Sequence, residues 1–394
     1  MKIALVCHQY SLRKGGLEKD TVLFSRELRK RGHEVHIFAN RRDDRDNTDN
    51  TASGIVFHHV PVFPFTSPGK NLSFALNAQR KLAETSFDII QGMDRILRQD
   101  IFRVSDGINP VQMQNRYPHP LIRGFFAATP RRMALTWLEQ QIFRKGGCRT
   151  VLAISRVIKN EIIRHYHVKP EHIRVIYNGV DTEIFHPGLK ELYRKKIREE
   201  YGIGEEEMLL LFISNDHKRK NLSALLRALQ LLLPQKFRLM VIGSDRSEPY
   251  RQQSIKMGIG DQLLFTGHQR QIESFFGASD IFVFPSHYDA FGNVCLEAMA
   301  AGLPLICSRT CGASELIRNG VNGFILEQKR PEELAEKISM LKNHSLRKQI
   351  GRQAARDAGQ YSIENHMSEV LDLYRHIIRS KKESHAGNIF HSVQ

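Results

Sequence analysis

The sequence predicts an α/β protein with two domains, each a doubly wound parallel sheet covered by helices. The chain has 394 residues, which is more than one ordinary hydrophobic core supports and suits two domains. Short apolar runs alternate with amphipathic helical stretches, as expected for parallel strands with helices on both faces. A charged stretch after residue 185 interrupts this alternation, which begins again at residue 208. The interruption indicates a change of domain.

The first alternation opens with a βαβ unit. Residues 3–7 are apolar, Gly15 and Gly16 mark a turn, and an amphipathic helix leads from this turn to a strand expected over 34–39. The polar stretch 41–51 that follows is expected to form a loop. Further strands of the first half are expected at 56–60, 88–91, 151–154 and 173–177.

The second alternation repeats the pattern. Its strands are expected at 208–214, 238–243, 263–266, 281–285 and 303–308, and its helices at 222–233 and 332–341. Both halves therefore have the order of a Rossmann-like domain. We assign an N-terminal domain to 1–185, a C-terminal domain to 186–362, a helix packing back on the N-terminal domain to 363–379 and a polar tail to 380–394.

Composition narrows the class of protein. Lys and Arg number 58 against 42 Asp and Glu, a net charge of +16 that indicates an acidic partner: nucleic acid, an anionic membrane or a phosphorylated glycan. The five cysteines form no paired C-x-x-C clusters, so zinc is not indicated and a reducing compartment is expected. The apolar run at the N-terminus is too short for a signal peptide, and no later run reaches the roughly 18 apolar residues of a membrane span. We expect a soluble or peripheral protein.

Residues 289–297 carry the most informative pattern. Asp289 and Glu297 stand eight positions apart, around a turn that leads into helix-forming residues, so Asp289 is expected in a loop and Glu297 in a helix. The turn would present four backbone amides to an anion at the helix's positive end, those of Phe291, Gly292, Asn293 and Val294. Carboxylates for hydroxyls and amides for phosphate together indicate a nucleotide-sugar site. The alternative is a turn-forming Asp289 and a surface Glu297.

A basic run at 216–221 follows an expected strand directly and precedes an expected helix. An isolated basic run is usually a solvated turn. At the mouth of a parallel sheet, Lys220 suits a diphosphate as a point charge and Arg219 as a bidentate partner, so that a departing nucleotide is stabilised without a metal. Gly15 and Gly16 also allow two interpretations: a tight turn, or a close approach of helix amides to phosphate.

The segment 107–150 interleaves cations with aromatic rings. Its acid is Glu139, against the cations Arg116, Arg123, Arg131, Arg132, Arg144, Lys145 and Arg149. Its large aromatic residues are Tyr117, Phe125, Phe126, Trp137 and Phe143. This combination suits an anionic bilayer surface, where each exposed cation contributes about 1 kcal/mol. An amphipathic core helix is the alternative.

Four segments, in the right order along the chain, resemble the retaining glycosyltransferases of family 4. They are GGLE at 15–18, RGHEV at 31–35, IYNGVD at 176–181 and the stretch 289–308. The resemblance covers nearly the whole chain and implies the GT-B fold, in which two Rossmann-like domains face a central cleft. The family's Glu-x7-Glu signature is matched by Asp289 and Glu297, with the shorter aspartate in first place. Within the family, the chain is most similar to the lipopolysaccharide core glucosyltransferases that add the first glucose to the inner-core heptose.

The resemblance also implies roles for the second-half candidates. Glu297 would hold the ribose hydroxyls, whereas Asp289 and the amides after it would hold the sugar and the diphosphate. Lys220 falls on the family's phosphate-binding lysine. The arginine usual several residues earlier is missing, and Arg219 is the candidate replacement. The backbone around Gly267 would recognise the base.

In the first half, Gly15 and Gly16 would approach the donor phosphate or the acceptor, and Asp106 would lie near the reacting sugar. The implied catalytic set is therefore Asp106, Asp289 and Lys220. The expected reaction moves a hexose, glucose from UDP-glucose, to the inner core of lipopolysaccharide or a related glycan, with retention and with no metal or other cofactor. The expected location is the cytoplasmic face of the inner membrane, as a peripheral protein on anionic lipid.

Two alternatives stay open. One is a sugar-nucleotide epimerase of the same fold, and the other is a basic nucleic-acid-binding protein, for which no helix-turn-helix, RNP or zinc pattern is present. Nucleic acid is therefore not the expected partner. The sequence leaves the donor base and sugar, the acceptor and its linkage, and the oligomeric state undetermined.

Overall fold

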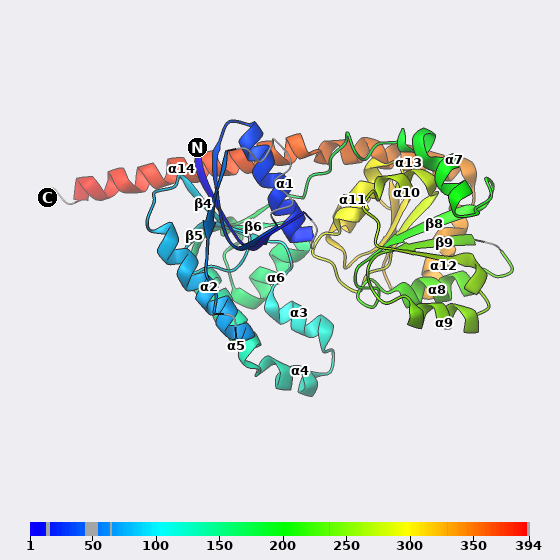
Figure 1. The fold of residues 1–394 in the computed structure, drawn as a ribbon, viewed down its shortest axis with the longest axis horizontal. Coiled ribbons are helices and arrows are strands. Elements are labelled where there is room, and N and C mark those ends of the chain that lie inside the picture. The colour runs from blue at the N-terminus through cyan, green and yellow to red at the C-terminus, as the bar shows by residue number, and fades with distance from the viewer. Residues whose placement is uncertain (13–15, 44–53, 64, 236, 329, 392–394) are drawn as a thin grey trace. The chain divides into compact units, whose positions relative to one another are not determined.

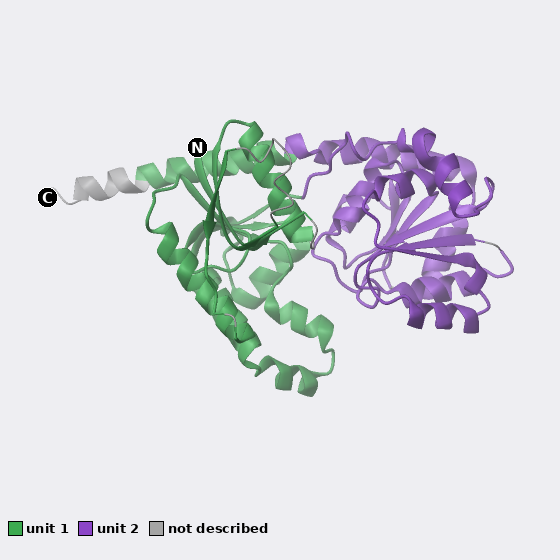
Figure 2. Ribbon diagram, viewed as in Figure 1, with its two compact units in different colours: residues 1–177, 366–394 green, residues 178–365 purple. Residues whose placement is uncertain are grey.

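The computed structural model describes residues 1–12, 16–43, 54–63, 65–235, 237–328 and 330–391. The chain forms two compact units: unit 1 contains residues 1–177 and 366–394, and unit 2 contains residues 178–365 (Figure 2). Each unit has one parallel sheet with helices packed on it (Figure 1). Within the described ranges, no helix has both the length and the apolar character needed to cross a membrane.

The change from unit 1 to unit 2 comes after Tyr177, earlier than the predicted boundary at 185–186. The reason is that the intervening residues bind unit 2. The amide of Val180 donates to the carbonyl of Tyr361 at 2.9 Å. Phe185 packs edge to face against Phe276, with ring centroids 5.6 Å apart.

Unit 1 has a seven-stranded parallel sheet with the order β3-β2-β1-β4-β5-β6-β7. Its strands are β1 Lys2–Tyr10, β2 Glu34–Arg42, β3 Ile55–His59, β4 Ile89–Gly92, β5 Gln99–Val104, β6 Cys148–Ala153 and β7 Ile173–Val175. In register, Ile3 of β1 lies beside Val35 of β2 and Ile89 of β4. The strand order reverses direction between β1 and β4, so the ligand crevice of this unit is expected at their carboxyl ends.

The helices of unit 1 cover this sheet. They are α1 Gly16–Lys30, α2 Ser67–Leu82, α3 Asn109–Arg116, α4 Pro120–Ala127, α5 Pro130–Arg144, α6 Arg156–Tyr166 and α14 Ile363–His391. Buried side chains of β1, β2 and α2 form one core cluster, which includes Val6, Phe38 and Phe74. Burying each of these side chains contributes roughly 1.5–3 kcal/mol.

Polar contacts fasten helix α14 to the sheet of unit 1. The hydroxyl of Tyr374, which is fully buried, donates to Gln91 Oε1 at 2.7 Å, and Lys381 Nζ donates to Asp100 Oδ2 at 2.6 Å. The helix continues to His391, where the sequence led us to expect a polar tail from residue 380. Residues 392–394 of that tail lie outside the described residues.

Unit 2 has a six-stranded parallel sheet with the order β10-β9-β8-β11-β12-β13. Its strands are β8 Met208–Ile213, β9 Phe237–Ile242, β10 Leu263–Gly267, β11 Ile281–Phe284, β12 Leu305–Ser308 and β13 Gly323–Leu326. Its helices are α7 Leu189–Glu200, α8 Leu222–Leu231, α9 Glu248–Lys256, α10 Glu273–Ala278, α11 Asn293–Ala300, α12 Pro331–Met340 and α13 His344–Ala358. In Figure 1, α8, α9 and α12 lie on one face of the sheet and α7, α10, α11 and α13 on the other. The strand order reverses between β8 and β11.

A buried acid fixes β8 against β11 at their amino ends. Asp280 directly precedes β11, and its Oδ2 accepts the amide of Leu209 at 2.9 Å, while its own amide donates to the Leu209 carbonyl at 2.8 Å. Arg198, only 1 % exposed, pairs with the same carboxylate at 3.4 Å and also donates to the carbonyl of Ala278. Because a buried carboxylate is costly unless it is paired and hydrogen-bonded, these contacts define one register for the two strands that position the site described below.

Candidate functional site

The predicted residues of unit 2 meet where its strand order reverses. Lys220 lies in the turn between β8 and α8, and Asp289 lies in the loop between β11 and α11. Because β8 and β11 are neighbouring parallel strands, their carboxyl ends bring these two loops together. Segments some 70 residues apart in the sequence thereby form one cluster of charges.

Lys220 is the buried centre of this cluster. Its side chain is 8 % exposed, and its ammonium contacts Asp289 Oδ2 and lies 4.6 Å from the centre of the Phe284 ring. Arg219 Nη1 lies 3.4 Å from the same carboxylate oxygen and donates to the carbonyl of Tyr288 at 3.3 Å. The two predicted cations therefore converge on the first predicted acid, and the interpretation of 216–221 as a merely solvated turn is wrong for Lys220.

Burial lowers the pKa of Lys220 to about 7, and the charge of Arg219 adds to this shift. Cys311, Cys295 and Asp216 oppose it, as does the direct contact with Asp289, which favours the ammonium form. A lysine in this setting carries a charge that water solvates poorly. An arriving phosphate would stabilise that charge strongly.

The turn after Asp289 is built for a sharp change of direction. Asp289 Oδ1 accepts the amide of Phe291 at 3.1 Å, and Gly292 has φ +85° just before α11 begins at Asn293. A Cβ on Gly292 would approach the sulfur of Cys311 to 2.9 Å, so glycine is required for conformation and for space. Of the four amides predicted to face an anion, that of Phe291 is instead engaged by Asp289. The amides of Gly292, Asn293 and Val294 lie at the positive end of α11, as expected.

Glu297 lies inside α11, one turn from its start, and is partly buried, as the sequence predicts. The structure adds a contact that the sequence did not indicate. Asn178 Nδ2 donates to Asn293 Oδ1 at 2.7 Å, although the two residues are 115 positions apart. Asn178 is 5 % exposed, so it is a buried support of the α11 start.

Three cysteines form the floor beneath this turn, another feature that the sequence did not indicate. The thiols of Cys295, Cys307 and Cys311 are fully buried, and Cys311 Sγ donates to the carbonyl of Phe291 at 3.0 Å. Burial raises the pKa of Cys295 well above its ordinary value, so this thiol packs as a small apolar group. In the part of the chain that the structure describes, no group of three metal-ligating side chains is arranged to hold an ion.

Gly267 ends β10 at the same edge of the sheet, with φ +70°. Its carbonyl accepts the amide of Gly243 at 2.9 Å, and the next residue, Ser244, donates its amide to Asn215 Oδ1 at 3.0 Å. A Cβ on Gly243 would overlap the carbonyl oxygen of Ser214. A chain of hydrogen bonds thus links the expected base-reading residue to the loop that carries Lys220.

The remaining candidates belong to unit 1. Gly16 begins α1 after β1, and a Cβ placed on it would meet nothing within 4 Å, so its backbone is open to a ligand. Gly15 lies outside the described residues. Asp106 follows β5 in an exposed bend. Protein on its other sides desolvates the carboxyl and raises its pKa, Asp94 and Glu18 raise it further, and Arg95 opposes the shift.

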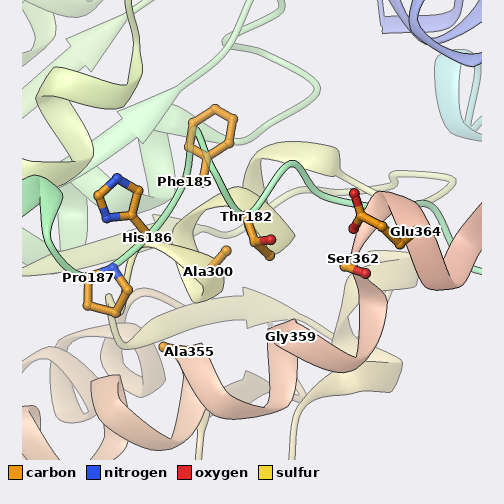
Figure 3. Close-up of a pocket in the computed structure, with 9 residues that line it drawn as sticks. All are labelled: Thr182, Phe185, His186, Pro187, Ala300, Ala355, Gly359, Ser362 and Glu364. Carbon is orange, nitrogen blue, oxygen red and sulfur yellow. The ribbon is translucent and has the colours of Figure 1, made fainter. Parts of the chain in front are cut away.

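Unit 2 also has a pocket of about 450 Å³, whose lining residues are drawn in Figure 3. It is at the carboxyl end of α11, near Ala300, whereas Asp289 and Asn293 are at the amino end of that helix. Its lining residues are Thr182, Phe185, His186, Pro187, Ala300, Ala355, Gly359, Ser362 and Glu364. None of the predicted donor-binding residues is among them, so this pocket is not the candidate site.

Comparisons with known proteins assign both halves of the chain. Residues 14–184 match the family described as Glycosyltransferase Family 4, and residues 193–357 match Glycosyl transferases group 1. The lipopolysaccharide glucosyltransferase WaaG of Escherichia coli K12 is 23% identical over 369 residues, 91% of this chain and 92% of WaaG. A D-inositol 3-phosphate glycosyltransferase of Acidothermus cellulolyticus is 26% identical to this chain. The match covers 93% of this chain and 87% of that enzyme.

Solved structures show the same architecture. The crystal structure of WaaG, a glycosyltransferase involved in lipopolysaccharide biosynthesis, matches with a TM-score of 0.79 at 22% identity, over 94% of this chain and 99% of WaaG. The structure of Anabaena HepE in complex with UDP matches with a TM-score of 0.74 at 19% identity, over 95% and 99% of the two chains. With family 4 and group 1 sequences in its two halves, the chain belongs to the GT-B glycosyltransferases.

Proposed function

We propose that this glycosyltransferase moves a glucosyl residue from UDP-glucose to the inner core of lipopolysaccharide or to a related glycan, with retention at the anomeric carbon. The observation that carries the proposal is the convergence of Lys220 and Arg219 on Asp289 where the strand order reverses. This is the position at which doubly wound sheets bind nucleotides. HepE, whose fold this chain shares, has been solved with UDP-glucose.

In the proposed complex, the donor diphosphate takes over the Lys220 ammonium from Asp289. Lys220, Arg219 and the amides at the start of α11 stabilise the charge that develops on the leaving diphosphate, so no metal is needed. Asp289, released from Lys220, binds sugar hydroxyls, and Glu297 binds the ribose. The bond from the anomeric carbon to the phosphate oxygen breaks as the acceptor oxygen bonds on the same face. The leaving phosphate accepts the acceptor's proton.

The acceptor side of the proposal rests on the surface of α4. This helix has no buried residue, and its Leu121 and Phe125 are 79% and 75% exposed. Arg116, before it, and Arg131, after it, are also exposed. Apolar side chains among cations suit an anionic leaflet, which supports a peripheral location at the cytoplasmic face of the inner membrane.

The alternative interpretation of 107–150, a core helix, describes the next helix. Helix α5 buries Leu138 and Ile142 against unit 1. The segment thus contains both a core helix and an exposed apolar one, and the membrane proposal concerns α4 and the exposed side of α5. WaaG is named for lipopolysaccharide and matches over nearly the whole chain, so its acceptor is the first to test.

Incubation of the purified enzyme with UDP-glucose and truncated lipopolysaccharide should add the mass of one hexose. Nuclear magnetic resonance of the product should show an α-linkage, the configuration of the donor, and the rate should survive a chelator. Incubation of the enzyme with the donor alone distinguishes transfer from epimerisation, because an epimerase converts the donor without an acceptor. No transfer across a panel of UDP-, GDP- and ADP-sugars with lipopolysaccharide and inositol phosphate acceptors would refute the proposal.

Lys220→Ala and Glu297→Ala should each lower kcat/KM for the donor by about 100-fold, because each removes a charged group that binds the nucleotide sugar. Steady-state kinetics measure the loss. The matched control is Lys218→Ala, because Lys218 is exposed on the same turn. Equal effects of Lys218→Ala and Lys220→Ala would mean that net charge, not the buried ammonium, attracts the donor.

Donor affinity should depend on pH in the direction set by Lys220. Its pKa in the free enzyme is lowered to about 7, so below pH 7 the ammonium is already present, whereas above it the site must take up a proton to bind the diphosphate. The affinity for UDP-glucose, a diester that does not titrate in this range, should be level below pH 7 and fall by up to about tenfold per pH unit above it. Calorimetric titration measures this. Lys220→Arg, charged throughout, should bind without that fall, and the same fall in Lys220→Arg would assign it to another group.

The double variant Leu121→Ser, Phe125→Ser should bind anionic vesicles at least roughly tenfold more weakly, because two apolar side chains lose their burial in the bilayer. Flotation with phosphatidylglycerol vesicles measures binding, and phosphatidylcholine vesicles test the charge requirement. Leu192→Ser is the control, since Leu192 is 63% exposed on α7 of unit 2. If the double variant binds the anionic vesicles as well as the unchanged enzyme does, α4 is not the membrane surface.

A further inference from the structure

Glu139, the acid among the cations of 107–150, is not a surface group. It lies in the middle of α5 and is 0% exposed. Its carboxylate accepts hydrogen bonds from three separate parts of unit 1. Arg95 Nε donates at 2.8 Å from the loop after β4, the amide of Asn109 donates at 2.9 and 3.1 Å from the loop after β5, and the hydroxyl of Tyr166 donates from α6.

These donors surround the loop that carries Asp106. Arg95, held by Glu139, also donates from Nη2 to the carbonyl of Gly107 at 3.2 Å. Asn109, two positions after Gly107, begins α3. The loop between β5 and α3 is therefore fixed at two points directly after Asp106, while the Asp106 residue itself stays exposed.

The same face of α5 continues the support. Arg132 Nη1 donates to Asn109 Oδ1 at 2.7 Å, and Asn109 Nδ2 donates to Thr136 Oγ1 at 2.8 Å. Arg132, Thr136 and Glu139 are spaced so that they lie on one side of the helix. A buried carboxylate paired with an arginine contributes little more to stability than well-packed apolar residues at the same positions would. Stability alone therefore does not explain a glutamate at this core position. The arrangement is better explained by what it positions.

The charges around Asp106 also depend on Glu139. Asp94 and Glu18 face the Asp106 carboxyl as like charges, whereas Arg95 and Arg103 face it as cations. Glu139 neutralises Arg95 directly, with Arg95 Nη2 at 2.6 Å from Oε1. Without the negative charge of Glu139, the field of Arg95 on Asp106 would be stronger.

We propose that Glu139 is a positioning residue for the transfer reaction, which holds the Asp106 loop through Arg95 and Asn109. The proposal rests on the proposed function and on the place near the reacting sugar that the family resemblance implies for Asp106. Glu139 itself touches no substrate. It acts by keeping one loop in one place and by holding Arg95 away from full interaction with the Asp106 carboxylate.

The test compares two tyrosine variants in the full-length enzyme. Tyr166→Phe removes a hydroxyl that donates to Glu139, and Tyr374→Phe, the control, removes a buried hydroxyl of unit 1 that donates to Gln91. Tyr166→Phe should lower kcat roughly tenfold with unchanged Kd for UDP, and should speed amide hydrogen exchange in 105–112, because the loop loses its fixed position. Tyr374→Phe should change neither.

Glu139→Gln tests the charge. It keeps the shape of the side chain but leaves Arg95 unneutralised, so the pKa of Asp106 should fall. The limb of the kcat–pH profile that belongs to Asp106 is the one that is absent in Asp106→Asn. In Glu139→Gln this limb should move to lower pH. A merely structural Glu139 would lower stability without moving this limb. If Glu139→Gln does not fold, the kcat and exchange data for Tyr166→Phe decide alone.

The outcomes separate this inference from the proposed function. Absence of transfer by the wild-type enzyme would refute the proposed function. Full activity of Asp106→Asn would leave that function intact but refute the role of Asp106, and with it this inference. Loss of activity in Asp106→Asn, with Tyr166→Phe indistinguishable from Tyr374→Phe in kcat and exchange, would refute the role of Glu139 alone.

Discussion

The site depends on one buried cation. Lys220 lies beneath the loop after β11, in contact with Asp289 and over the ring of Phe284, with little access to water. Taking an ammonium out of water is costly, and one carboxylate shared with Arg219 repays only part of that cost. The free enzyme therefore holds its lysine in an electrostatically unsatisfied state. A diphosphate offers this lysine more negative charge than Asp289 does, so binding energy is available where the leaving group must be stabilised.

The fold of unit 2 positions the two residues that make this contact. Lys220 and Asp289 are placed by the carboxyl ends of β8 and β11, and Asp280 with Arg198 fixes the amino ends of the same region. The floor of the turn is made of small buried groups, with Gly292 against the sulfurs of Cys295 and Cys311. In unit 1 another buried ion pair, Arg95 with Glu139, fixes the loop of Asp106. Each unit thus uses a buried charge pair to position one loop at the end of its sheet.

Much of this was predictable from the sequence because it depends on local patterns. Apolar runs of the right length predicted most of the strands, and the Asp289–Glu297 spacing predicted a loop acid and a helix acid. The family resemblance predicted a glycosyltransferase of the GT-B type, which the comparisons confirm. Two strands were missed. Strand β5 has polar or charged residues at three of its six positions, and the short β13, Gly323–Leu326, offers only three apolar residues after a turn. The burial of Glu139 and the Asn178–Asn293 bond were missed because both depend on contacts between distant segments, which no local pattern encodes. The engaged amide of Phe291 was missed because an aspartate side chain competes locally for a backbone donor.

The central claim is that Lys220 and Asp289 act on the donor as one unit. The most direct measurement is a double-mutant cycle on UDP-glucose binding by calorimetry, with Lys220→Ala, Asp289→Ala and the combined variant. Our account predicts that the two effects are not additive, with a coupling free energy above about 0.5 kcal/mol, as found for residues in contact within one charged network. Effects that add within error would show that the two side chains meet the donor independently or not at all, and would contradict the account.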